Sequence, residues 1–466
     1  MIPDTAGTRR RAVQAGRPAP RFAAAGATAF ALIVAPLLLL GASAPGPRNL
    51  ILMVPDGSGP AAFALARMLR GQPLSLDSLL TGGVGTASLN SRVTDSAAAA
   101  TAYATGMRTR NRMLSIDSGG VARRTLFEAA AAAGLATGLV VKCRVTDATP
   151  AAFIAHATER SRETDIALDE LAHRPDVLLG GGRDRFLPAS QGGRRDDDRD
   201  LVEEARRAGW QVATSREELD GPLRTPLLGL FARGDLGYAI DADPAVPGLP
   251  AMVRRALSLL GGGPRGFVLL VEGSLIDHGA HENDPATVAR EALEFDDAVA
   301  EVIAFARRDA HTLVVCAADH ETGGLTLGRR SGGGGPSDLA PESLLAVTSS
   351  AARMQDSVRG GTAAVPLFER LTGLHLTPAE RETLQAAAGR GKASESFADL
   401  ESAHARLSWA TGGHTAADVG LFAFGPGSER FRGRLANDDV GRRLAASLRL
   451  SVGEALPAGA QGGAGR

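Results

Sequence analysis

The sequence predicts an α/β fold, with a large, mostly parallel, doubly wound sheet that carries helices on both faces. Short apolar runs at 49–54, 267–271 and 312–317 have the uniform composition of strands covered on both faces. Helical patterns such as 285–307 separate the runs, as in repeated strand–helix units. Acidic residues and histidines in glycine-containing turns follow several runs, at the strand ends where open α/β sheets bind ligands.

Length, charge and cysteine content limit the class of protein. A chain of 466 residues can bury a large core, and its formal net charge of −1, with arginines dispersed among acids, argues against nucleic-acid specificity. Its two cysteines, Cys143 and Cys316, each lie at the edge of an apolar run. Two free core thiols are the favoured interpretation, and one disulfide between them is the alternative.

The first 44 residues have the layout of an export signal. An arginine-rich start (Arg9, Arg10, Arg11, Arg17 and Arg21) precedes the apolar stretch 22–41 and the small residues 42–44. We therefore expect a periplasmic or secreted protein. Because the apolar stretch is nearly long enough to span a bilayer, an uncleaved N-terminal membrane anchor is the alternative. The first two arginines also allow a twin-arginine signal.

Taken in order, the first chemistry follows strand 49–54 and its turn PDGSG, which holds Asp56. The segment 93–106 (VTDSAAAATAYATG) then predicts an alanine-rich helix with Asp95 and Ser96 at its positive end, where an anion is favoured. A plain N-cap explains either residue equally well. Strand 138–141 leads to VTDATP and a helix expected to continue from 151 to 161. This helix would place His156 and Arg160 one turn apart.

The second half of the chain holds the densest chemistry. Strands at 177–180 and 227–231 carry no functional pattern, but 267–271 is followed by Glu272, Asp277, His278 and His281. One helical turn would present Asp277 and His281 to a single cation. Strand 312–317 ends in DHETGG, which holds Asp319 and His320. A helical insert is expected at about 329–406, then TGGHT with His414, a strand at 420–425, and a disordered tail at 451–466.

Because parallel strand ends share one edge of a sheet, these clusters can converge. Six motifs in order carry a specific resemblance: PDGSG, VTDSAAAATAYATG, TDATPAAFIAHATER, VEGSLIDHGAH, AADHETGG and TGGHTAADV. The sequence resembles the alkaline phosphatase family from Asn49 to about Gly427, which implies a catalytic domain at 47–450.

The resemblance implies a role for each matching residue. Ser96 matches the serine that is transiently phosphorylated, Arg160 the arginine that grips phosphate, and Asp95 the residue that steadies that arginine. The implied cofactors are two Zn²⁺ and one Mg²⁺. Their ligands would be Asp277, His281 and His414 for the first zinc, Asp56, Asp319 and His320 for the second, and Asp56, Thr149 and Glu272 for magnesium. Asp147 and His278 match positions that support the third metal.

The implied activity is hydrolysis of phosphate monoesters through a phosphoserine, and homodimers are common in the family. Histidine and carboxylate suit open zinc sites, oxygen ligands suit magnesium, and a guanidinium fork suits phosphate. A phosphodiesterase or sulfatase of the same superfamily, and a non-catalytic phosphate- or metal-binding surface protein, are the alternatives. The absence of a GxSxG pattern disfavours a Ser-His-Asp hydrolase.

Overall fold

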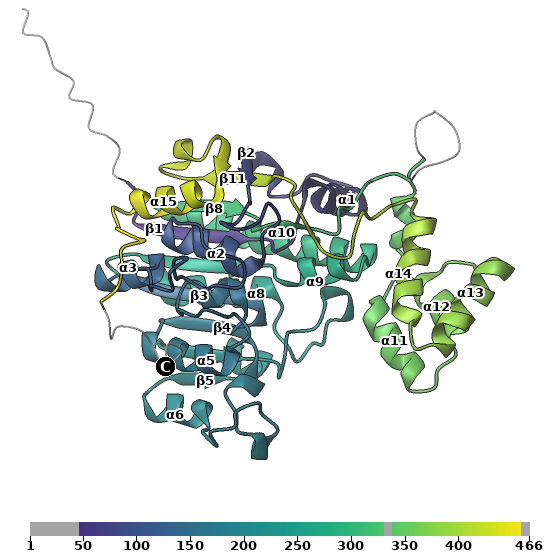
Figure 1. The fold of residues 1–466 in the computed structure, drawn as a ribbon, viewed down its shortest axis with the longest axis horizontal. Coiled ribbons are helices and arrows are strands. Elements are labelled where there is room, and N and C mark those ends of the chain that lie inside the picture. Colours follow the sequence, from purple (N-terminus) through teal and green to yellow (C-terminus); the bar gives the residue numbers. More distant parts are fainter. Residues whose placement is uncertain (1–45, 330–337, 458–466) are drawn as a thin grey trace, which may run out of the picture. The chain divides into compact units, whose positions relative to one another are not determined.

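The computed structural model describes residues 46–329 and 338–457, whose strands form one ten-stranded sheet and one two-stranded sheet. The large sheet has the order β12-β2-β11-β8-β1-β7-β3-β4-β6-β5, and helices cover both of its faces (Figure 1). Its strands are β1 (Asn49–Val54), β2 (Leu80–Gly85), β3 (Ala136–Arg144), β4 (Val177–Gly181), β5 (Gln211–Ala213), β6 (Leu227–Leu230), β7 (Phe267–Glu272), β8 (Thr312–Ala317), β11 (Val419–Phe424) and β12 (Gly433–Ala436).

Strand β1 lies inside the sheet and pairs in parallel with β7 on one side and β8 on the other. All six of its residues are buried. Leu50 and Leu52 join the apolar core on one face, while Ile51 and Met53 join the core on the other. The run is uniformly apolar because neither face meets water. The expected doubly wound α/β architecture is therefore confirmed.

Two helical layers cover the sheet. On one face lie α2 (Ser96–Thr105), α3 (Leu126–Ala132), α5 (Glu163–His173), α6 (Leu201–Arg207) and α15 (Asn437–Ser447). On the other lie α1 (Pro60–Arg70), α7 (Arg216–Asp220), α8 (Leu249–Leu260) and α10 (Pro285–Asp309). Two short helices, α4 (Ala148–Ala151) and α9 (Leu275–His281), follow β3 and β7. They begin at the strand ends where the sequence places its polar clusters.

The sheet departs from a purely parallel one at β11, which runs antiparallel to both β8 and β2. The strands β2, β5 and β12 were not predicted. Strand β2 reads LTGGVG, and its glycines hide a strand pattern because they weaken β propensity.

The segment expected as a helical insert contains four helices: α11 (Ala351–Arg359), α12 (Ala364–Thr372), α13 (Pro378–Gly389) and α14 (Ala393–His404). They share an apolar core of their own, in which the rings of Phe368 and Phe397 stack with centroids 5.5 Å apart. Helix α14 packs against α10, which links the insert to the sheet-bearing part. Part of the expected insert, residues 330–337, lies outside the described residues.

The helix expected from 151 to 161 is wrong. Helix α4 ends at Ala151, and the chain beyond it pairs with an earlier segment: the Ala157 N–H donates to the Leu114 carbonyl and the Arg160 N–H to the Arg112 carbonyl. Those bonds replace helical ones, so His156 and Arg160 are not one helical turn apart. Alanine-rich composition favours a helix, but tertiary pairing decides otherwise here.

The chain after residue 450 also differs from the expectation of a disordered tail. Gly453 and Leu456 donate backbone hydrogen bonds to Arg124 and Ala122, and Val452 packs against the core. Residues 451–457 are therefore ordered, and the rest of the expected tail, 458–466, lies outside the described residues.

Both cysteines are buried and free, as favoured from the sequence. Cys143 is on β3 and Cys316 on β8, with β7 and β1 between them, and strands spaced by about 4.8 Å put these residues beyond disulfide reach. The predicted signal or anchor at 1–44 lies outside the described residues. Within the described part, no helix is both long and apolar enough to cross a membrane.

Candidate active site

The site forms where three neighbouring strands end. Strands β8, β1 and β7 lie side by side in parallel, so their carboxyl ends meet at one edge. Asp56 lies two residues past β1, Asp319 lies two residues past β8, and Glu272 is the last residue of β7. The topology thus brings Asp56 to the same edge as two carboxylates that follow it by more than 200 positions in the sequence.

Asp56, Asp319 and His320 form a buried cluster whose nitrogen and oxygen atoms lie within 4.8 Å of one another. His320 Nε2 is 3.2 Å from Asp319 Oδ2 and 3.5 Å from Asp56 Oδ1. Asp319 Oδ1 accepts hydrogen bonds from the backbone N–H groups of Gly57 (3.3 Å) and His320 (3.0 Å), which fixes this carboxylate.

Two buried carboxylate oxygens of this cluster lack hydrogen-bond partners. Asp56 Oδ1 and Asp319 Oδ2 are buried and accept no hydrogen bond from any described residue. Burial, together with the charges of Asp319 and Asp277, raises the pKa of Asp56 well above its usual range. Burial also lowers the pKa of His320 and so keeps its imidazole neutral. A cation would satisfy both orphaned oxygens and the neutral ring nitrogen at once.

A second cluster consists of Asp277, His281 and His414, again with donor atoms within 4.8 Å. Asp277 and His281 share one face of α9, as the spacing predicted, with His281 Nε2 3.3 Å from Asp277 Oδ2. His281 Nδ1 donates to the Gly412 carbonyl (2.7 Å) and His414 Nδ1 to the Thr94 carbonyl (2.9 Å). Both Nε2 atoms therefore point inward, 3.2 Å apart, with lone pairs available to a cation.

A small two-stranded sheet joins the two clusters. Strands β9 (Glu321–Thr322) and β10 (His414–Thr415) pair antiparallel, with His414 opposite Thr322. This pairing stacks the His414 ring on the His320 ring, with centroids 3.6 Å apart. The Thr322 hydroxyl donates to Asp277 Oδ1 and lies 3.2 Å from His320 Nδ1. The Thr322 hydroxyl therefore links Asp277 of the second cluster to His320 of the first.

Ser96 is the first residue of α2 and is only 4% exposed. Its Oγ lies 3.2 Å from His320 Nε2. Asp95, not Ser96, is the N-cap, because Asp95 Oδ1 accepts from the Ala98 N–H at 3.0 Å. The Ser96 hydroxyl is therefore free of capping duty and faces the buried cluster from a positive helix end.

Arg160 reaches the same region from the loop after α4. Its Nη2 donates to Asp147 Oδ1 (2.9 Å) and its Nη1 is 3.5 Å from Asp95 Oδ2. Although burial alone would raise it, the charges of Arg160 and Arg144 lower the pKa of Asp147 to about 2. Asp147 thus stays ionised and holds the guanidinium on one side.

Two further oxygen-bearing side chains, Thr149 and Glu272, come from the ends of β3 and β7, the strands that follow β1 in the sheet order. Thr149, on α4, has a buried hydroxyl with no hydrogen-bond partner in the described part of the chain. Glu272 is 1% exposed, and burial together with the charges of Asp147 and Asp319 raises its pKa to about 8. Its Oε2 accepts from the Cys143 thiol at 3.3 Å. Crowded carboxylates and an orphaned hydroxyl are what a hard cation would relieve.

Sequence reasoning missed three residues that support the site. Arg144 donates to both Asp147 and Asp235, and Asp235 Oδ2 lies 3.8 Å from His278 Nδ1. Nothing in the sequence around Arg144 or Asp235 marks them, because their partners lie on other elements. Thr322 lies within the DHETGG motif, so its position next to His320 was the only available signal.

Comparison with known proteins identifies the family of this chain. The family model for alkaline phosphatase matches residues 47–450. The chain belongs to the alkaline phosphatase family. It is 35% identical to the repressible alkaline phosphatase of Saccharomyces cerevisiae, over 87% of this chain and 82% of that protein. It is 34% identical to alkaline phosphatase 4 of Bacillus subtilis, over 84% of this chain and 87% of the relative.

A solved structure agrees. The crystal structure of a cold-active alkaline phosphatase from the psychrophile Shewanella sp. matches with a TM-score of 0.79 and 33% identity, covering 86% of this chain and 99% of that one. As a member of the alkaline phosphatase family, the chain is a phosphoric monoester hydrolase that depends on metal ions. Membership of this family favours the monoesterase over the alternatives of a diesterase and a non-catalytic binding protein.

Proposed function

We propose that Ser96 is the nucleophile and that the reaction passes through a phosphoserine. The observation that carries this proposal is the position of Ser96 Oγ, 3.2 Å from His320 and at the positive end of α2. A helix N-terminus favours the anionic phosphate, and a hydroxyl beside a candidate cation cluster can be ionised. A binding protein would not need a hydroxyl there.

We infer that the two histidine-containing clusters hold zinc and that the all-oxygen set of Asp56, Thr149 and Glu272 holds magnesium. The donor types fit: neutral imidazole and carboxylate for zinc, carboxylate and hydroxyl for magnesium. The orphaned Asp56, Asp319 and Thr149 oxygens are the structural support for this assignment. Bound there, the metals would lower the pKa of a coordinated hydroxyl and offset the negative charge of the phosphate.

The chain's own residues then perform two displacements. Ser96 Oγ forms a bond to phosphorus as the bond to the alcohol breaks, and the alcohol leaves with a proton. A water molecule next forms a bond to phosphorus as the Ser96 Oγ–phosphorus bond breaks, releasing inorganic phosphate. Two inversions give net retention at phosphorus. In both steps the Arg160 guanidinium donates to phosphate oxygens, held in place by Asp147 and Asp95.

Asp147 and His278 are not among the proposed metal ligands. Asp147 pairs with two arginines, and His278 faces Asp235. We propose that both act by positioning: Asp147 orients Arg160, and His278 stabilises the loop that carries Asp235.

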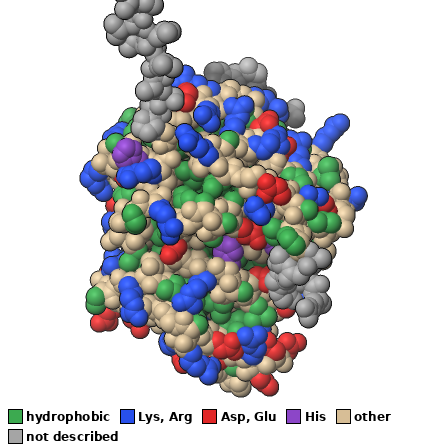
Figure 2. Space-filling view, turned by 90° about the vertical axis from the view of Figure 1, so that its left-hand side faces the viewer, with side chains coloured by type: hydrophobic (Ala, Val, Ile, Leu, Met, Phe, Trp, Pro, Cys, Tyr) green, Lys and Arg blue, Asp and Glu red, His purple; other side chains and the backbone are tan. Residues whose placement is uncertain are grey.

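We further propose that the protein works outside the cytoplasm, on the arginine-rich and apolar pattern of residues 1–44. Retention of that segment would make it a membrane tether, and the family resemblance favours a homodimer. On the face in Figure 2, lysine and arginine side chains are dispersed rather than gathered in a stripe, which supports small phosphate monoesters rather than nucleic acids as substrates. Light scattering of the exported protein, with N-terminal sequencing, tests the dimer and the cleavage.

The roles are tested by hydrolysis of an aryl phosphate monoester and of the matching diester, with zinc and magnesium present. We expect the monoester to be preferred, and Ser96→Ala to lower kcat by several orders of magnitude. Ser91→Ala, five residues earlier, is the matched control and should leave kcat unchanged. Full activity of Ser96→Ala would exclude Ser96 as the nucleophile.

A further inference from the structure

The guanidinium of Arg144 lies among three carboxylates that come from three different segments. Arg144 is the last residue of β3, and its Nη1 donates to both carboxylate oxygens of Asp235, each at 2.8 Å. Its Nε donates to Glu163 Oε2 at 2.8 Å, and its Nη2 donates to Asp147 Oδ2 at 2.9 Å. Because a guanidinium is planar and points its N–H groups in fixed directions, Arg144 fixes where each of these carboxylates lies.

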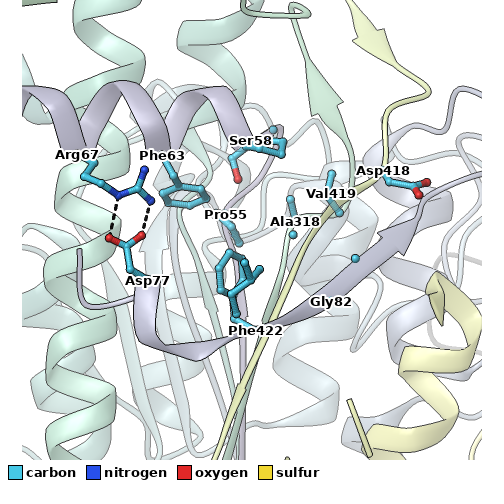
Figure 3. A pocket seen from close by; sticks show the side chains of 15 residues that line it. Pro55, Ser58, Phe63, Arg67, Asp77, Gly82, Ala318, Asp418, Val419 and Phe422 are labelled. Atoms are coloured by element: carbon cyan, nitrogen blue, oxygen red, sulfur yellow. Dashed lines mark hydrogen bonds and ion pairs between the residues drawn. The ribbon is translucent and has the colours of Figure 1, made fainter. Parts of the chain in front are cut away.

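An ion pair with a single carboxylate shows the contrast. Arg67, on α1, donates to Asp77, and the two side chains are 41% and 28% exposed (Figure 3). Exposed pairs of this kind contribute little to stability. The Arg144 side chain is only 20% exposed and joins the start of α4, the start of α5 and the loop after β6. Its place is therefore one of organisation rather than of surface charge.

The two carboxylate oxygens of Asp147 have separate partners. Oδ1 accepts from the Ala148 N–H at 2.7 Å and from Arg160 Nη2 at 2.9 Å. Oδ2 accepts from Arg144, its only hydrogen-bond partner in the described part of the chain. Without Arg144, one oxygen of Asp147 would have no anchor, and the carboxylate would be free to turn.

Arg160 depends on Asp147 more than on its other acidic neighbour. Its Nη1 is 3.5 Å from Asp95 Oδ2, whereas its Nη2 meets Asp147 at 2.9 Å. Asp95 Oδ2 already accepts from the Arg112 N–H at 3.0 Å. The orientation of the Arg160 guanidinium therefore follows Asp147, which Arg144 holds.

We propose that Arg144 is a positioning residue that sets the affinity of the site for phosphate. Arg144 hydrogen-bonds to none of the proposed metal ligands, and it acts through Asp147, which directs Arg160. The inference rests on the role proposed for Arg160 as the residue that grips phosphate. A guanidinium held in one orientation can donate two parallel hydrogen bonds to phosphate oxygens, and one that rotates loses part of that contact.

Arg144→Lys is the test variant, because lysine keeps the positive charge among the three carboxylates but lacks the planar fork. Calorimetry of the metal-loaded protein should give a Kd for inorganic phosphate about tenfold higher than in the wild type, the order of one charge-assisted hydrogen bond. The titrations are made with zinc and magnesium saturating and with the bound metal measured. A Kd that returns to the wild-type value when more metal is added would contradict the inference.

Asp235→Asn is a second variant, which keeps Arg144 and weakens one of its three anchors. It should raise the phosphate Kd about threefold, because a neutral amide accepts a weaker hydrogen bond than a carboxylate. An unchanged Kd in Asp235→Asn would count against the inference even if Arg144→Lys failed to fold.

Arg185→Lys is the matched control. The Arg185 side chain is 15% exposed and donates to the same Glu163 and to Asp184, each at 3.0 Å, but it makes no hydrogen bond to Asp147. Its substitution should lower Tm and leave the phosphate Kd unchanged. A general effect on folding or on local charge would raise the Kd in both lysine variants, and that result would refute a specific role for Arg144.

A double-mutant cycle shows whether Arg144 acts through Asp147. Asp147→Asn alone should raise the phosphate Kd, because a neutral amide holds Arg160 less strongly. Adding Arg144→Lys to Asp147→Asn should then raise the Kd by less than about twofold, against about tenfold in the wild-type background. Full additivity of the two substitutions would overturn the proposed route.

Arg160→Ala separates this inference from the proposed function. If Arg160→Ala leaves the phosphate Kd unchanged, the grip proposed for Arg160 is wrong. If Arg160→Ala weakens phosphate binding while Arg144→Lys has the wild-type Kd, the proposed function stands and the positioning role of Arg144 is refuted.

Discussion

The Thr149 hydroxyl allows a test in which one substitution has opposite effects with and without magnesium. Thr149 is 2% exposed and its Oγ1 has no partner among the described residues. Valine has nearly the same shape without the hydroxyl. In metal-free protein, Thr149→Val should raise the free energy of unfolding by about 1 kcal/mol, because it removes an unsatisfied buried polar group.

With magnesium the sign should reverse. A ligand at about 100 times its Kd stabilises the wild type by about 2.7 kcal/mol, and Thr149→Val should lose most of this gain because it lacks one magnesium donor. Urea unfolding of the metal-free protein, without and with added Mg²⁺, measures both values.

A neighbouring threonine serves as the control. Thr146 is fully buried, but its hydroxyl donates to Glu163 at 2.9 Å, so Thr146→Val should destabilise the protein with or without magnesium. The reasoning is refuted if Thr149→Val lowers the stability of the metal-free protein and keeps the full magnesium increment.

Three further predictions concern the phosphate grip, a buried ion pair and the metals. Arg160→Lys should lower kcat/KM by about 10- to 100-fold, measured by steady-state kinetics, because an ammonium cannot donate two parallel hydrogen bonds. Burial lowers the pKa of His156, but Glu128 at 3.0 Å outweighs burial and raises it above the usual 6.5. The pair's stabilisation is therefore full between the lowered pKa of Glu128 and about pH 6.5, and it fades as pH rises through the raised folded-state pKa of His156. His156→Gln should cost about 2 kcal/mol in urea unfolding at about pH 6 and less at alkaline pH. An equal cost at both pH values would contradict this. Chelation should lower Tm in calorimetry, zinc should restore it, and an unchanged Tm would argue against folded-state metal sites.

The strands at the site could be predicted because burial on both faces leaves only apolar residues. β1, β7 and β8 are of this kind, and the residues after them are conspicuous because they interrupt a uniform pattern. β2 was missed because glycine carries no side chain from which to recognise alternation. Helix 151–161 was wrongly expected because the Ala157 and Arg160 N–H groups donate to Leu114 and Arg112, a pairing that no local pattern reveals.

The same distinction applies to the site. Asp277 and His281 lie on one helical turn, so their meeting follows from local geometry. His414 reaches them only through the pairing of β10 with β9, which required the resemblance to a family. Arg144 pairs with Asp147 and Asp235, and Asp235 faces His278. Because most of these contacts join distant elements, the sequence alone could not identify Arg144 or Asp235.

The central claim is that Ser96 carries the phosphoryl group. The direct measurement is mass spectrometry of the metal-loaded protein, acid-quenched during turnover of an aryl phosphate and digested into peptides. The account predicts a phosphoryl group on Ser96 in the wild type and on no residue in Ser96→Ala. Turnover with unmodified Ser96, or with the phosphoryl group on another residue, would contradict it.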